Sequence, residues 1–202
     1  DSVISSHESG LKVLLGPQRP ELADEIEATP DSIARIIERV ASDYDFIVVD
    51  TRCHLDNLLL AMTDIASKIV LAATPTLAGI KNNKFVLDRM DYPPEKIMFV
   101  LNKVDEERNK NRGTVATESI EKYLKRPVNA KIPNNEPAIL GAVNQGVPVV
   151  VVQRDRKQSP GRELLEFADS VYTALMQDSE LELEAGADKP KRAGFGLRAG
   201  KN

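Results

Sequence analysis

The 202-residue chain contains few of the residues that stabilise secreted or metal-binding proteins. It has one cysteine, Cys53, two histidines and no tryptophan, and aromatic residues make up 4% of it. A single cysteine cannot form an intrachain disulfide, and a Cys/His metal site would have too few ligands. No apolar run approaches the roughly 20 residues that cross a bilayer, and no signal-peptide pattern opens the chain. We therefore expect a cytoplasmic protein with no transmembrane segment.

The chain also has no large excess of positive or negative charge. Lys and Arg total 27 against 31 Asp and Glu, a formal net charge of -4, so the sequence gives no strong nucleic-acid or anionic-lipid signal. Apolar residues make up 42%, enough for the aliphatic core of one domain. From Gln177 the chain turns acidic and then basic. We expect a domain over residues 1–176 and a disordered charged tail over 177–202.

Short apolar runs alternate with helix-periodic stretches along the rest of the chain. This alternation predicts a doubly wound α/β fold, a mainly parallel sheet with helices on both faces. Ligands bind such sheets at the carboxyl ends of the strands, here at Asp50, Thr74 and Asn102. The predicted strands are 11–15, 46–50, 68–73, 96–102 and 128–132, and the predicted helices are 29–40, 55–66, one through Ile80 and Leu87, 115–124, 136–144 and 161–176.

The run from Tyr44 to Asp50 has the form of a Walker B strand. Its apolar residues would be buried, and its terminal carboxylate could reach Mg²⁺ or the water shell of the ion. Asp is also common after strands as a turn residue or a helix cap, so that reading of Asp50 stays open.

Asn102-Lys103-Val104-Asp105 follows a predicted strand and matches the N-K-x-D pattern that reads a purine edge. A plain polar loop is the alternative. A guanine-reading GTPase usually pairs this pattern with Asp-x-x-Gly after the Walker B strand. Cys53 stands where that Gly would be, which weighs against GTP.

Four segments together resemble the MinD/ParA superfamily of deviant P-loop ATPases, and most closely its CpaE/TadZ branch. They are Gly10–Pro17, Tyr44–Asp50, Asn102–Asp105 and Ile132–Pro148, within a resemblance over about residues 8–176. The resemblance implies ATP and Mg²⁺ as ligands, a homodimer, and pilus or secretion assembly proteins as partners at a cell pole. It also implies that Asp50 assists Mg²⁺ and catalysis, that Asn102 contacts the adenine edge, and that Pro133 and Asn134 line the base pocket.

The chain departs from this family in two places. The family's Lys-Gly-Gly-x-Gly-Lys-[Ser/Thr] loop, whose amides and lysines hold the phosphates, occurs nowhere in the sequence. We therefore expect the chain to be the C-terminal part of an ATPase domain, and a receiver-like domain upstream would be usual in the CpaE branch. Arg52 also replaces the Pro that commonly follows the Walker B Asp-Thr.

Three functions follow from these observations. The leading hypothesis is an ATPase that positions a Flp/Tad pilus assembly apparatus through nucleotide-linked dimerisation. The second is a non-hydrolysing scaffold that keeps the fold and acts by dimerisation and partner contacts, which Arg52 and the missing Walker A loop favour. The third is a GTPase that reads guanine through Asn102–Asp105.

Overall fold

The computed structural model describes residues 4–16, 30–51, 55–105 and 114–187. The chain divides into two compact units, Asp1–Ser67 and Lys68–Asn202, and each is described by itself.

The described residues of the first unit form a hairpin, two α-helices and a short 3₁₀ helix. Strand β1 (Ile4–Ser6) pairs antiparallel with β2 (Lys12–Leu14), and Gly10 adopts a φ of 90° in the turn between them. Helix α2 (Pro30–Val40) is followed by the short 3₁₀ helix η1 (Ala41–Asp43). Helix α3 (Asn57–Ile65) contacts α2 and begins at Asp56, whose carboxylate accepts a 2.8 Å hydrogen bond from the Leu59 amide.

The predicted strand over Phe46–Asp50 is not formed. These residues belong to no helix or strand, and the Val48 side chain is 92% exposed. An apolar run becomes a strand only where a neighbouring strand takes up its backbone hydrogen bonds, and none of the strand pairings among the described residues includes this run. The prediction that the apolar residues of this run are buried is also wrong, because Phe46, Ile47 and Val49 are exposed as well.

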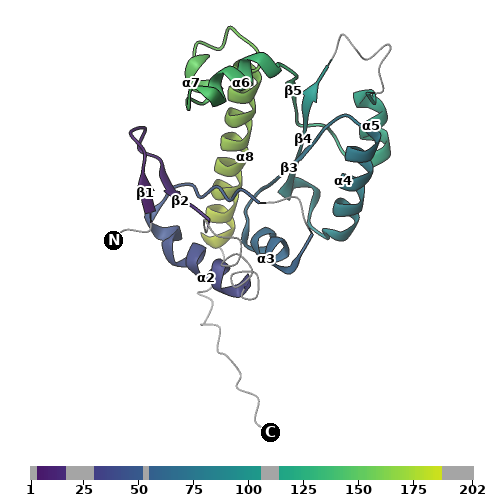
Figure 1. Ribbon diagram of the computed structural model, residues 1–202. Coiled ribbons are helices and arrows are strands. Elements are labelled where there is room, and N and C mark those ends of the chain that lie inside the picture. The colour runs from purple at the N-terminus through teal and green to yellow at the C-terminus, as the bar shows by residue number, and fades with distance from the viewer. Residues whose placement is uncertain (1–3, 17–29, 52–54, 106–113, 188–202) are drawn as a thin grey trace. The chain divides into compact units, whose positions relative to one another are not determined.

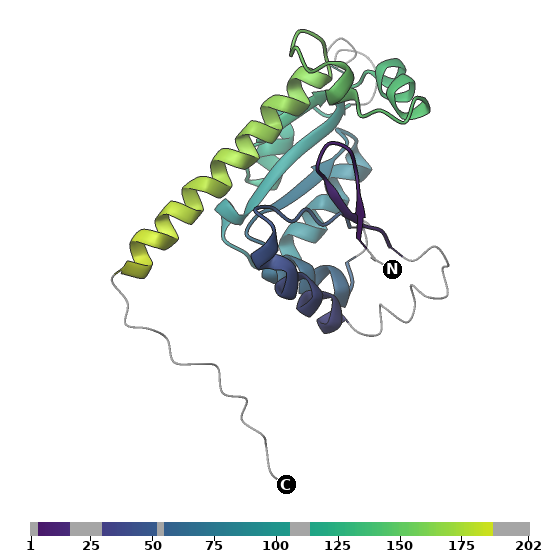
Figure 2. The ribbon, with the colours of Figure 1, turned by 90° about the vertical axis from the view of Figure 1, so that its left-hand side faces the viewer.

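The second unit is built on a three-stranded parallel sheet in the order β3-β4-β5, which confirms the predicted α/β fold. Ile69 of β3 aligns with Ile97 of β4, and Val100 of β4 aligns with Ala130 of β5. Helices α4 and α5 lie on one side of this sheet and α8 on the other (Figures 1 and 2). The bounds are β3 (Ile69–Ala73), α4 (Leu77–Arg89), η2 (Pro94–Lys96), β4 (Ile97–Val104), α5 (Thr117–Leu124) and β5 (Ala130–Pro133).

The core of this unit lies between the sheet and helices α4 and α5. Phe99 and Leu101 of β4 and Ile120 of α5 are fully buried, and Ile80 of α4 joins their cluster. The residues of β4 are apolar from Ile97 to Leu101 because helices cover the strand on both faces.

Three helices complete the unit: α6 (Glu136–Asn144), α7 (Val149–Val152) and α8 (Gly161–Ala187). Helix α8 continues eleven residues beyond the predicted helix end at 176, which corrects the predicted start of the disordered tail at 177. The segment between them is rich in Glu, Leu and Ala, which favour helix, and the sequence interpretation gave more weight to its charge. The remainder of the predicted tail, 188–202, lies outside the described residues. Among the described helices, none is both long and apolar enough to cross a membrane.

Candidate functional site

The carboxyl end of β4 carries a bulge at the predicted base-reading residues. The sequence predicts that the strand ends at Asn102, but it continues to Val104, and the pairing skips from Leu101↔Lys131 to Val104↔Pro133. Lys103 has a φ of 57°, and its amide donates to the Asn102 side-chain oxygen at 2.9 Å. Asn102 and Lys103 are exposed while Val104 is buried. The bulge therefore presents the Asn102 side chain to solvent and keeps the strand anchored beyond it.

Pro133 and Asn134 lie beside this bulge. Pro133 pairs with Val104 at the end of β5, and the Asn134 amide donates to the Val104 carbonyl at 2.8 Å. Three of the four predicted site residues, Asn102, Pro133 and Asn134, thus come together at one edge of the parallel sheet. This is the edge where such sheets bind ligands.

The loop that carries Asn134 is held by its neighbour Asn135. The Asn135 side-chain oxygen accepts from the Ala138 amide at 3.2 Å and caps α6, and the side-chain nitrogen donates to the Ser159 carbonyl at 3.0 Å. Sequence analysis did not single out Asn135. An Asn directly before Glu-Pro is a recognisable helix start, but its bond to Ser159, 24 residues away, leaves no local pattern.

Asp50, the fourth predicted residue, belongs to the first unit and is exposed at the end of the apolar segment that starts at Phe46. The other three residues belong to the second unit. Its neighbours Arg52, Cys53 and His54 lie outside the described residues. In the described part of the chain, no group of three or more His, Cys, Asp or Glu side chains could hold a metal ion. A single carboxylate is nevertheless a typical protein contribution to Mg²⁺, whose other ligands are phosphates and water.

The edge of the sheet offers hydrogen-bonding groups suited to a purine. The Asn102 side-chain oxygen already accepts from Lys103, so its amide group is left to donate. A donor of this kind can bind a ring nitrogen of adenine or of guanine. Asn102 alone therefore does not distinguish the two bases.

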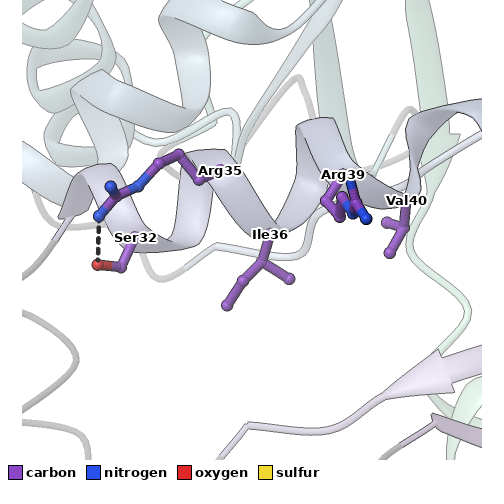
Figure 3. Close-up of a pocket in the computed structure, with 5 residues that line it drawn as sticks. All are labelled: Ser32, Arg35, Ile36, Arg39 and Val40. Carbon is purple, nitrogen blue, oxygen red and sulfur yellow. Dashed lines mark hydrogen bonds between the residues drawn. The ribbon is translucent and has the colours of Figure 1, made fainter.

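The structure also contains two hollows. The first, about 460 Å³, runs along one side of α2 and is drawn in Figure 3. Arg35 lines it and donates to Ser32 Oγ at 3.2 Å, and Ile36 and Val40 supply apolar surface. The second, about 210 Å³, lies between α4 and α5 and is lined by Leu77, Ile80 and Tyr123 among others. Neither hollow contains a predicted site residue.

The segment that precedes α8 is held by charged groups near the Asn135 contact. Arg156 makes a two-point contact with Asp169, with nitrogen–oxygen distances of 2.5 and 3.2 Å. These hydrogen bonds and the positive charge of Arg156 lower the pKa of the Asp169 carboxyl. Burial raises the pKa of Glu163, but hydrogen bonds from its own backbone amide and from Arg162 lower the pKa more.

The chain is similar in sequence to a putative MinD and to an ATP-binding protein. It is 21% identical over 168 residues to a putative septum site-determining protein MinD of Emiliania huxleyi, covering 83% of this chain and 61% of that protein. It is 24% identical over 195 residues to an uncharacterized ATP-binding protein of Methanocaldococcus jannaschii, covering 94% of this chain and 70% of that protein. No protein-family model matches the chain.

Solved structures of ParA and MinD proteins share the fold of this chain. A ParA family ATPase from Chlorobium tepidum superposes with a TM-score of 0.70 at 22% identity, over 82% of this chain and 65% of that one. The MinC:MinD cell division complex of Aquifex aeolicus gives 0.67 at 19% identity, over 84% and 66%. MinD of Pyrococcus horikoshii complexed with Mg-ADP gives 0.66 at 20% identity, over 84% and 67%. The chain thus has the fold of ParA and MinD ATPases and is similar in sequence to a putative MinD, and it spans 61% of that MinD and 65% of the ParA structure.

Proposed function

We propose that this chain is part of an ATP-binding localisation factor of the MinD/ParA kind, of the CpaE/TadZ branch. In this proposal it positions a Flp/Tad pilus assembly apparatus at a cell pole, in the cytoplasm, through nucleotide-linked dimerisation. The observation that carries the nucleotide part is the meeting of Asn102, Pro133 and Asn134 at the carboxyl ends of β4 and β5.

The adenine base is proposed to lie against this edge. Asn102 donates its side-chain amide to the base, and Pro133 offers an apolar ring to one face of it. The backbone bond from Asn134 to Val104, 2.8 Å long, fixes the loop on which the base would rest. The Asn135 contacts to Ala138 and Ser159 hold that loop from behind, so little order has to be gained when the base binds.

The phosphates and Mg²⁺ would be held by residues other than those proposed to contact the base. Asp50 is the residue proposed to assist Mg²⁺, which when bound would neutralise phosphate charge and orient the phosphates for attack by water. Because the sequence contains no Gly-x-x-x-x-Gly-Lys loop, we propose that a Walker A loop outside the printed sequence holds the phosphates. The Mg-ADP bound to the similar MinD of P. horikoshii supports these ligands for this chain.

A non-hydrolysing scaffold is the alternative, and one observation favours it. Arg52 follows the Asp50-Thr51 pair where the family commonly has Pro, at the position of its nucleotide-responsive loop. The scaffold would keep the base site and the partner contacts without turnover. The MinC:MinD complex is an example of a similar chain assembled with a partner protein.

Nucleotide binding to the full-length protein tests the base site. By calorimetry, Asn102→Ala is expected to weaken ATP binding by about 1–3 kcal/mol, because one hydrogen bond to the base is lost. Asn82→Ala, which alters an exposed Asn on α4, is the matched control and should leave the dissociation constant unchanged. An unchanged affinity of Asn102→Ala for ATP would contradict the assignment, and preferential competition by GTP would favour the GTPase hypothesis.

The cellular role needs a separate test. A fluorescent fusion of the full-length protein is expected at a cell pole, and removal of the gene is expected to abolish polar pili. Uniform fluorescence together with normal pili would contradict the pilus assignment and leave the nucleotide site unaffected.

A further inference from the structure

Asn135 differs from the other two asparagines near the base site because both ends of its side chain are bonded within the protein. Its oxygen accepts from the Ala138 amide at 3.2 Å, and its nitrogen donates to the Ser159 carbonyl at 3.0 Å. The Asn135 side chain is half-buried, whereas Asn102 and Asn134 are exposed. Asn135 is therefore placed to support the base site rather than to contact a ligand.

Two successive residues fasten the loop after β5 to two different elements. The Asn134 amide donates to the Val104 carbonyl of β4 at 2.8 Å, and the Asn135 side chain donates to the segment that precedes α8. Pro133 lies directly before both residues, at the end of β5. Because binding costs less entropy when the loop of a site is already ordered, these two bonds should raise the affinity for the base.

The acceptor of the Asn135 bond belongs to a well-packed turn. Pro160, the residue after Ser159, is fully buried, and the Gly161 amide donates to the buried side-chain oxygen of Gln153 at 2.8 Å. Helix α8 continues from this turn and contacts both α7 and β5 (Figures 1 and 2). The Asn135 bond thus joins the loop of the base site to the start of a long helix.

We propose that the Asn135–Ser159 hydrogen bond couples the base site to the start of α8. Binding of the base holds residues 133–135 in place, and the bond transmits this order to the turn at residues 159–161. Order in that turn raises the affinity for the base by the same factor, because coupling between two sites is reciprocal. Asn135 is then a positioning residue, which acts through the loop and does not touch the nucleotide. The inference rests on the proposed function, since it takes the base site as assigned there.

Asn135→Asp in the full-length protein separates this bond from the helix cap. Aspartate is as good an N-cap as asparagine, so α6 keeps its first turn, but a carboxylate cannot donate to the Ser159 carbonyl. We expect the dissociation constant for ATP to rise about three- to tenfold, because one hydrogen bond that orders the loop is lost. Inorganic tripolyphosphate has no base and should bind the variant as tightly as it binds the wild type.

Hydrogen exchange of the Gly161 amide measures the other end of the coupling. In the wild type, ATP is expected to slow this exchange, because the bound base holds the turn through Asn135. Tripolyphosphate should not slow it. In Asn135→Asp, ATP should leave the exchange rate of the Gly161 amide unchanged, because the bond that carries the effect is missing.

Asn82→Asp is the matched control, since it makes the same chemical change at an exposed residue of α4 and should alter neither measurement. Circular dichroism shows whether the variants remain folded. If Asn135→Asp does not fold, Asn135→Ser replaces it. Serine also caps helices well, and its shorter side chain carries no amide group to donate to the Ser159 carbonyl.

Equal affinity of the wild type and Asn135→Asp for ATP would overturn the coupling, as would Gly161 exchange that ATP does not slow in the wild type. A parallel loss of ATP and tripolyphosphate binding would also overturn it, because Asn135 would then have a structural role only. These results leave the base site itself intact. An unchanged affinity of Asn102→Ala for ATP would instead contradict the base site and, with it, the coupling.

Discussion

Gln153 and Gly161 fit against each other where α7 leads into α8. The buried side-chain oxygen of Gln153 accepts from the Gly161 amide at 2.8 Å, and a Cβ on Gly161 would lie 2.5 Å from the Gln153 Cβ. The bond supplies a partner for an amide of the first turn of α8, which has no partner within the helix. Gly161 is thus required because a Cβ at this position would clash with Gln153. Gln153 is required because its side-chain oxygen accepts the hydrogen bond from the Gly161 amide.

Gly161→Ala is expected to lower the free energy of unfolding by about 1–3 kcal/mol, because the added methyl group must displace Gln153. Gly141→Ala is the matched control. Nothing lies within 4 Å of a Cβ at Gly141 in α6, so that substitution should be neutral or stabilising, by up to about 1 kcal/mol. Urea unfolding of both variants measures the difference, and equal stabilities would contradict the contact.

The substitution Asp178→Asn tests whether α8 extends beyond residue 176. Its carboxylate lies 2.7 Å from Lys68 Nζ, whose side chain is 8% exposed, and Lys68 also donates to the Glu95 carbonyl at 2.9 Å. Asp178→Asn should cost about 1 kcal/mol, a value reduced by solvent because Asp178 itself is 40% exposed. Asp88→Asn, which removes a surface pair with Lys84, is the control and should cost less than about 0.5 kcal/mol. An equally small effect of Asp178→Asn in denaturant unfolding would argue against the ion pair.

The Arg156–Asp169 pair should make stability depend on pH. Since its pKa is lowered in the folded chain, Asp169 contributes stability above the pKa of the unfolded state, and the contribution is lost as the pH falls through the folded pKa. Arg156→Ala should therefore differ from the wild type at neutral pH and converge with it in acid. An NMR titration of the Asp169 carboxyl should show its pKa rising in Arg156→Ala. An unmoved pKa would contradict the contact.

The printed chain by itself is expected to hydrolyse ATP no faster than a buffer blank. Positioning and charge stabilisation of the phosphates supply most of the catalysis of phosphoryl transfer, and the sequence contains no Walker A loop to provide them. A coupled phosphate-release assay measures this. Turnover that disappears in Asp50→Ala would contradict the expectation and show that the chain carries a complete site.

The sequence by itself determined the parallel α/β core. Unbroken apolar runs such as Ile97–Leu101 are buried on both faces, and helix-periodic stretches separate them, so local composition was enough to predict β3, β4, β5 and the helices around them. The same pattern placed Asn102 and Pro133 near strand ends. The end of α8 predicted from composition was wrong, because a run of acidic residues can be helical when Leu and Ala accompany it.

Only the tertiary structure decided which of these residues meet. The bulge at Lys103 carries β4 on to Val104, and the bond from the Asn134 amide to the Val104 carbonyl joins residues 30 positions apart. Asn135 finds Ser159, and Gln153 finds Gly161, through contacts that no local pattern encodes. Tertiary pairing also decided against a strand at Phe46–Asp50. A strand depends on hydrogen bonds to another segment, and the apolar character of a run cannot specify whether that segment lies beside it.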